Sequence, residues 1–333
     1  MPHPNLVAIA NDLLGQNPGP VVRYRLLRDV LQRPAHDPEL ARAKAALDES
    51  HGVRELAAEQ WPDGSWGAFH SQASRRKQKI ITTEMGVERA LALGLDASHP
   101  ILQKAANYII QIMKGEFEFP DRQEKNDRWQ MGKRLFLAST LSLIHSDHPL
   151  LEEDRTSWLE IARRTFQSGA YREEDEIRAH IALTGATVKD SYLVLNGKYQ
   201  LNLLGFRAGA LPPPLEQILL QWLWERPDGI GYLNIPLKPP PPQQPGPLDR
   251  WLASLEMLAR LFPAAPEIVG EAFTWLWEKQ NEQGYWDFGP RPASITYLPL
   301  YDSWRKRQNR TFDWTTRVLA LLSAIRSGKT TPR

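Results

Sequence analysis

Acidic side chains stand where helices of this chain are expected to begin, and they are the residues best suited to chemistry. Glu84 directly follows Thr82 and Thr83. Because either threonine can cap the helix, the carboxylate of Glu84 stays available to give or take a proton, which makes it the first candidate for a catalytic acid. Four further acids open other expected helices, and each is either a cap or a reactive group: Asp127, Asp190, Asp249 and Asp313. Of these, Asp127, Asp249 and Asp313 are retained as catalytic candidates.

Two short windows concentrate positive charge, although the net charge of the chain is only +2. Neither window, 75–79 or 305–310, contains an acid, and each precedes an expected helix start. Their guanidinium and ammonium groups are either solvated or hold an anionic ligand such as a diphosphate, a carboxylate or an acidic sugar. The binding residues expected from these windows are Arg75, Arg76, Lys79, Arg305, Arg307 and Arg310.

Further ligand contacts are expected from aromatic and basic residues beside the helix starts. Aromatic faces can stabilise a cationic intermediate, and a neutral imidazole such as that of His70 can carry protons. The residues expected to contact a ligand in this way are His70, Arg128, Trp129, Tyr192, Arg250, Trp251 and Trp314.

Several functions are disfavoured by composition. With no cysteine, the chain has no disulfide, no thiol nucleophile and no sulfur ligand for zinc. His145 and His148 flank Asp147 in a segment expected to end a helix, so no metal site is predicted. No phosphate loop or dinucleotide fingerprint occurs, and we expect no cofactor.

The small net charge argues against nucleic acid as a partner. No apolar run of about 18 residues and no signal-like start occur, which predicts a cytoplasmic protein without a transmembrane segment. The oligomeric state stays open.

A repeat organises the chain. Turns containing glycine recur at Gly64, Gly115, Gly169, Gly229 and Gly284, at intervals of 51, 54, 60 and 55 residues. An amphipathic run precedes each later turn, and a polar loop and a second helical run follow it, which indicates helical hairpins. The preceding runs are 100–113, 151–167, 215–225 and 268–280. With the runs 5–14 and 20–31, about six hairpins form a single domain, 1–333, with repeats over 20–327.

The proline-rich segment 236–247 interrupts this pattern. It has seven prolines in twelve positions, so we expect an extended loop that serves as a spacer, a lid or a docking site.

The turn "WPDGSW", 61–66, places two tryptophans where a turn needs only Asp, Gly or Pro. We interpret this as structural. A glutamine at the helix end can bond to free backbone groups while a tryptophan covers the joint.

The spacing around this turn and its last copy resembles a known repeat. Trp275-Leu276, Gln280, Gly284 and Trp286 match the QW repeat of squalene-hopene and related triterpene cyclases, and Gln60, Gly64 and Trp66 match its core. The resemblance implies an all-α, (α/α)6 toroid, with an inner ring of helices around a cavity and an outer ring, as also found in protein prenyltransferase β subunits. The catalytic motifs of those relatives, Asp-x-Asp-Asp, Asp-Asp-x-x-Asp and a cysteine-containing zinc set, are absent.

Three functions follow as hypotheses. The first is a terpene-cyclase-like enzyme with a basic-rimmed cavity for an anionic, largely apolar, isoprenoid-like ligand. The second is a non-catalytic toroid that binds a lipid or a partner, which the missing motifs favour. The third is a lyase or hydrolase of acidic polysaccharide, since toroids also serve such enzymes. Whether the protein is an enzyme stays open at this level.

Overall fold

The computed structural model describes residues 4–71, 78–122, 129–185, 194–207, 209–242, 244–290 and 299–326. Within these ranges all regular elements are helices, and the only β-type pairings are two isolated bridges, Ala68 with Thr82 and Gly197 with Gly231. The all-α class is therefore confirmed for the described residues. The (α/α)6 arrangement of those helices stays a prediction.

The chain divides into two compact units. Unit 1 consists of Met1–Ala58, Leu91–Gly94 and Ile235–Pro332, and unit 2 consists mainly of Glu59–Ala90 and Leu95–Asn234. Each unit has its own buried core, and each contains one of the two turns with the Gln, Gly and Trp spacing of the QW repeat, which are called QW-type turns below.

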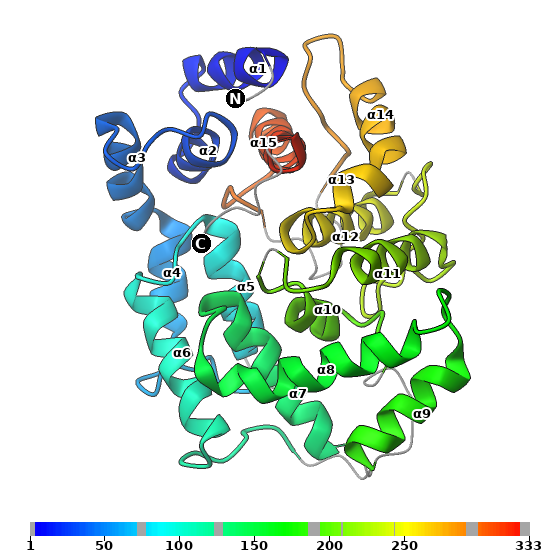
Figure 1. Ribbon diagram of the computed structural model, residues 1–333. Helices are drawn as coiled ribbons and strands as arrows, with labels where there is room; N and C mark the ends of the chain where they lie inside the picture. Colours follow the sequence, from blue (N-terminus) through cyan, green and yellow to red (C-terminus); the bar gives the residue numbers. More distant parts are fainter. Residues whose placement is uncertain are drawn as a thin grey trace. The chain divides into compact units, whose positions relative to one another are not determined.

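Unit 1 is built around its last helix. Helix α15 (Arg307–Arg326) packs against α1 (Pro4–Gly15), α2 (Pro20–Arg25), the π-helical turn that follows α2 (Leu26–Val30), α12 (Pro245–Leu261) and α13 (Ala265–Ile268) (Figure 1). The unit also contains α3 (Pro38–Asp48), α14 (Gly270–Glu278) and nearly all of α4 (His51–Glu59). Phe312, Trp314 and Val318 of α15 are buried, because this helix contacts neighbours on several sides.

Unit 2 is built around α7 (Trp129–Ile144), which packs against α6 (Pro100–Met113) and α10 (Lys198–Leu204). Helix α8 (Glu152–Thr165) follows a 3-10 turn, Pro149–Leu151, and packs against α9 (Glu173–Thr184) and α10. The unit also contains α11 (Pro213–Glu225) and the first two turns of α5 (Thr83–Leu93). Every residue from Leu135 to Ile144 of α7 is buried, so the second half of this helix is fully enclosed.

Several helix boundaries differ from the expectation. Helix α6 has the predicted ends, but α12 begins at Pro245 and α15 at Arg307, so Asp249 and Asp313 lie inside helices and their interpretation as caps is wrong. Pro245 can open α12 because a proline in the first turn loses no hydrogen bond there. The extended proline-rich segment therefore ends before the predicted residue 247. Helix α3 was not predicted.

The two QW-type turns share one hydrogen-bond pattern. In the first, Gln60 Nε2 donates to Gly64 O at 2.9 Å and Trp66 N donates to Thr83 Oγ1 at 3.2 Å. In the second, Gln280 Nε2 donates to Gly284 O at 2.8 Å and Trp286 N donates to Thr315 Oγ1 at 3.0 Å. Trp66 and Trp286 are fully buried. The structural interpretation of glutamine and tryptophan is confirmed at both turns.

Three further features distinguish the first turn. Trp61 is 42% exposed, so it does not cover the joint as Trp66 does. Gly64 has a φ of +95°, which a residue with a side chain rarely adopts, and a Cβ there would lie 2.3 Å from Lys104 O. Gln60 Nε2 also donates to Ile101 O at 2.9 Å, which ties the turn to the start of α6.

Candidate functional site

A buried loop positions His70 beside the start of α5. The carboxylate of Asp121 accepts three backbone N–H groups, from Phe69 at 2.6 Å, His70 at 2.8 Å and Ser71 at 2.7 Å. Glu84 N donates to Phe69 O at 3.2 Å, so the loop runs along the first turn of α5. Thr82 Oγ1 accepts Met85 N and caps the helix, as predicted, which leaves the Glu84 side chain for other contacts.

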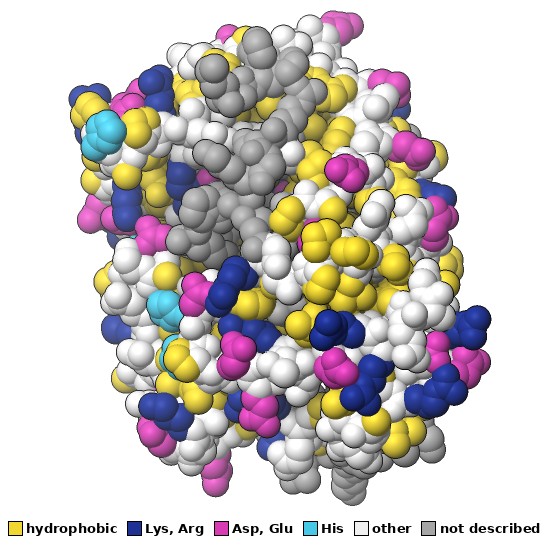
Figure 2. Space-filling model, in the orientation of Figure 1, with side chains coloured by type: hydrophobic (Ala, Val, Ile, Leu, Met, Phe, Trp, Pro, Cys, Tyr) yellow, Lys and Arg dark blue, Asp and Glu magenta, His cyan; other side chains and the backbone are white. Residues whose placement is uncertain are grey.

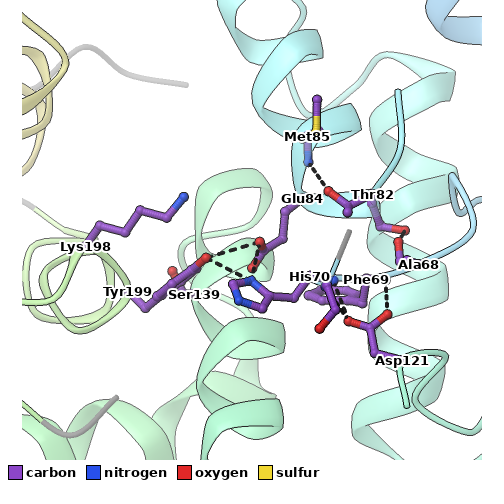
Figure 3. A network of polar contacts seen from close by, with 12 residues as sticks. Ala68, Phe69, His70, Thr82, Glu84, Met85, Asp121, Ser139, Lys198 and Tyr199 are labelled. Carbon is purple, nitrogen blue, oxygen red and sulfur yellow. Dashed lines mark hydrogen bonds and ion pairs between the residues drawn. The ribbon is translucent and has the colours of Figure 1, made fainter. Parts of the chain in front are cut away.

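Three polar side chains meet at this point (Figure 3). Glu84 Oε2 lies 2.9 Å from His70 Nδ1 and accepts a hydrogen bond from Tyr199 OH at 3.1 Å. Tyr199 OH is also 3.1 Å from His70 Nδ1. Glu84 Oε1 is buried and has no hydrogen-bond partner among the described residues. The side chain of His70 is 20% exposed and that of Glu84 10%, so the cluster is nearly enclosed and meets solvent through the imidazole.

Aromatic rings surround the cluster. The imidazole of His70 stacks on Phe136 of α7 with centroids 3.9 Å apart. Tyr232 meets both His70 and Tyr199 edge to face, at 6.1 and 4.8 Å between centroids. The polar groups therefore sit in an apolar, electron-rich surrounding, where hydrogen bonds and charges act more strongly than in water.

Two charged groups border the cluster on the side of Tyr199. Lys198 Nζ lies 3.0 Å from Glu88 Oε1 and 4.8 Å from the ring centroid of Tyr199. Burial raises the pKa of Tyr199 well above its ordinary value, and the carboxylates of Glu84 and Glu88 add to this rise. Tyr199 is therefore a neutral phenol that donates its proton in a hydrogen bond.

Asp313, another predicted acid, has a different role. Its Oδ2 accepts Leu300 N at 2.8 Å, Tyr301 N at 3.2 Å and Trp304 Nε1 at 2.7 Å, and the side chain is fully buried. Three donors on one oxygen make this carboxylate an anchor for the segment before α15.

Asp249 is also buried but carries a strong ion pair. Its Oδ1 lies 2.6 Å from Arg317 Nη1, and Oδ2 is buried without a partner among the described residues. Burial raises the pKa of Asp249, and the nearby Arg317 opposes the rise. Arg317 also binds Glu256 at 2.6 Å, so the arginine holds α15 against α12. Asp249 stays a catalytic candidate. Among the described residues, however, no acid or base contacts it that could pass a proton to or from its carboxyl group.

The predicted basic windows are only partly described. Arg75, Arg76, Asp127, Arg128, Asp190 and Tyr192 lie outside the described residues. Arg310 donates to both oxygens of Asp287 at 2.7 Å, and Arg307 lies 3.5 Å from the same carboxylate. The backbone N–H of Lys79 donates to Glu59 Oε1, and that of Arg305 donates to Ser303 Oγ, both at 3.2 Å. Figure 2 shows basic and acidic side chains interspersed over the described part of the face in view.

The predicted aromatic contacts lie mostly in the core. Trp129, Trp251 and Trp314 are buried. Trp251 Nε1 donates to Leu237 O at 2.7 Å, and Trp314 Nε1 donates to Gly289 O at 3.0 Å. Arg250 is half-buried on α12. The indole N–H groups of Trp251 and Trp314 therefore each bind a loop to the helix that carries the tryptophan, which is a structural role.

The structure brings together two of the predicted residues, Glu84 and His70, and adds three that sequence reasoning missed: Phe136, Tyr199 and Tyr232. Tyr199 stands in a short helix without a strong pattern, and Phe136 is one of many apolar residues in α7. In the sequence, Tyr199 is marked only by its hydroxyl group and by a position just after Gly197, which precedes the helix. These features do not distinguish it from the other tyrosines.

Within the described residues, no group of three or more His, Asp or Glu side chains could hold a metal ion. None of the described helices is long and apolar enough to span a membrane. Comparison of the chain with protein-family models, with curated proteins and with solved structures finds no match. The conclusions about function therefore depend on the described residues alone. These form helices, two QW-type turns and a nearly enclosed cluster of His70, Glu84 and Tyr199.

Proposed function

We propose that His70, Glu84 and Tyr199 form a proton-transfer centre that acts on a largely apolar, isoprenoid-like ligand in a terpene-cyclase-like protein. One observation carries the proposal. Tyr199 OH donates to Glu84 Oε2, and the Nδ1–H tautomer of His70 would donate to the same oxygen, while Oε1 is buried and has no partner among the described residues. A carboxyl group arranged in this way has one oxygen stabilised by the protein and keeps the other, which has no described partner, to carry the proton.

The chemistry follows from this asymmetry. With its proton on Oε1, Glu84 can protonate a carbon–carbon double bond: the O–H bond breaks, the π electrons form the new C–H bond, and a carbocation results. The carboxylate left behind is stabilised by the hydrogen bonds at Oε2 from His70 and Tyr199. The rings of Phe136 and Tyr232 provide electron-rich faces beside the cation. Loss of a different proton from the cation to Glu84 restores the acid.

The anionic end of such a ligand would meet Lys198. This lysine is bound to Glu88, whose side chain is 41% exposed and stands one helical turn after Glu84. An anionic head group can replace an exposed glutamate at little cost, because exposed ion pairs contribute little stability. We therefore assign Lys198 the binding role that the basic windows were expected to fill.

An acidic polysaccharide fits this centre less well. A lyase of that kind needs a base near an acidic sugar, but the pKa of Tyr199 is raised, chiefly by burial and then by Glu84 and Glu88. The remaining alternative is a protein that binds a lipid without reacting with it, and the experiment below distinguishes it from an enzyme.

The test measures proton transfer from solvent. The protein is incubated in D2O with farnesyl diphosphate, farnesol and squalene, and products are analysed by mass spectrometry for carbon-bound deuterium. We expect deuterium incorporation with the wild type and its loss in Glu84→Gln. Glu160→Gln is the control and should retain it, because Glu160 lies in the same unit, pairs with Arg164 and is not part of the cluster. Binding of these compounds without any deuterated product in the wild type would instead identify a lipid-binding protein.

A further inference from the structure

A pocket of about 340 Å³ lies in unit 1, on the exposed side of α14, and none of its lining residues belongs to the proton-transfer centre. We infer that it binds a compact organic cation, a quaternary ammonium or a guanidinium group. Its lining consists of Pro239, Pro240, Glu271, Thr274, Trp275 and Glu278.

The acidic residues of the pocket share one face of α14. Glu271, Trp275 and Glu278 are spaced by four and three residues, so their side chains form one stripe along the helix. Both glutamates are exposed. Neither side chain makes a hydrogen bond or ion pair with another described residue. Within the described part of the chain, two carboxylates without an ion-pair partner therefore flank an indole ring in one pocket.

The indole ring of Trp275 is held in place and already attracts a cation. Its edge packs against Trp251 with centroids 5.3 Å apart, and Phe288 lies nearly parallel at 6.3 Å. The ammonium nitrogen of Lys279 lies 5.3 Å from the ring centroid of Trp275, which is within the range of a cation–π interaction. Lys279 is exposed, so a ligand can displace it readily and Lys279 acts as a competitor within the chain.

The two prolines of the lining explain why the ligand should be organic. Pro239 and Pro240 have no backbone N–H and offer only apolar ring surface and carbonyl groups. A cation with methyl or planar apolar surface can contact the prolines and the indole while the carboxylates balance its charge. A strongly hydrated ion such as Na⁺ gains nothing from these apolar walls.

Isothermal titration with tetramethylammonium chloride and with L-arginine amide tests the site, with sodium chloride as the ionic-strength control. We expect the organic cations to bind and sodium to give no signal. Trp275→Leu should weaken binding at least about tenfold, and Glu271→Gln or Glu278→Gln about threefold each. Comparing the two ligands shows which cation type the pocket prefers.

Two variants keep the test decisive even if Trp275→Leu fails to fold. Lys279→Met removes the internal competitor and should tighten binding about threefold, whereas a purely structural lysine would leave binding unchanged or weaken it. Glu282→Gln removes an acid of the adjoining turn that does not line the pocket, and it should leave binding as in the wild type. Absence of binding for both cations, or weaker binding in Lys279→Met, overturns the inference.

Discussion

The Nδ1 atom of His70 lies 2.9 Å from Oε2 of Glu84, in a cluster whose polar atoms are largely buried. The backbone around His70 is fixed by Asp121, and Glu84 is fixed by the capped start of α5. The backbone of both residues is therefore held in place by hydrogen bonds, and the two side chains meet from fixed positions. Such rigidity is what a proton-transfer centre requires, because the reacting groups must be positioned before the ligand arrives.

Tyr199→Phe removes one donor to Glu84 and keeps the ring. We expect the rate of deuterium incorporation to fall about 10- to 100-fold, because the carboxylate formed during proton transfer loses a stabilising hydrogen bond. Tyr171→Phe is the matched control, since Tyr171 donates to Glu176 at 2.7 Å in the same unit but away from the cluster. Equal losses in both variants would indicate a general structural effect.

Trp66→Ala and Trp286→Ala each empty a fully buried site at a QW-type turn. We expect each to lower the free energy of unfolding by about 3–5 kcal/mol, as truncations of buried aromatic residues do. Trp61→Ala, at the exposed end of the first turn, should cost less than about 1 kcal/mol. Denaturant unfolding measures all three, and losses below about 1 kcal/mol at both buried sites would refute the structural role.

Gly86→Ala should destabilise the protein, although alanine normally favours a helix. A Cβ at Gly86 would lie 2.3 Å from the ring of Trp66, which is fully buried and cannot move aside. We expect a loss of about 1–3 kcal/mol from overpacking. Gly270→Ala, where nothing lies within 4 Å of the added Cβ, is the control and should be close to neutral. Thermal unfolding of the two variants decides the comparison.

Asp29 should contribute to stability above pH 4 and lose that contribution in acid. Burial tends to raise the pKa of its carboxyl, but Arg25 and Arg28 outweigh burial and lower the pKa to about 2, from 3.8. A carboxyl group with a lowered pKa in the folded state stabilises the protein above the unfolded pKa, and the contribution disappears as pH falls through about 2. The difference corresponds to about 2 kcal/mol. Asp29→Asn should remove this part of the pH dependence in urea unfolding between pH 5 and 2.

Local patterns in the sequence determined the helical class, the positions of most helices that precede the glycine turns, and the two QW-type turns. Helix α6 matches its predicted ends because amphipathic spacing and a proline start are properties of neighbouring residues. The roles of Gln60 and Trp66 were predictable for the same reason, since the glutamine and the glycine it contacts are four residues apart. Glu84 was selected because the threonines before it can cap the helix, and Thr82 Oγ1 does accept Met85 N.

Only the tertiary structure decided what surrounds that acid. Tyr199 reaches Glu84 across 115 positions of sequence, and no periodicity connects a short helix to a carboxylate so far away. Asp313 was kept as a catalytic candidate from its place in the sequence, yet its Oδ2 accepts three N–H donors from a folded loop. Hydrogen-bond saturation depends on which backbone groups lack partners once the helices have packed, and that is a property of the assembled core rather than of any local segment.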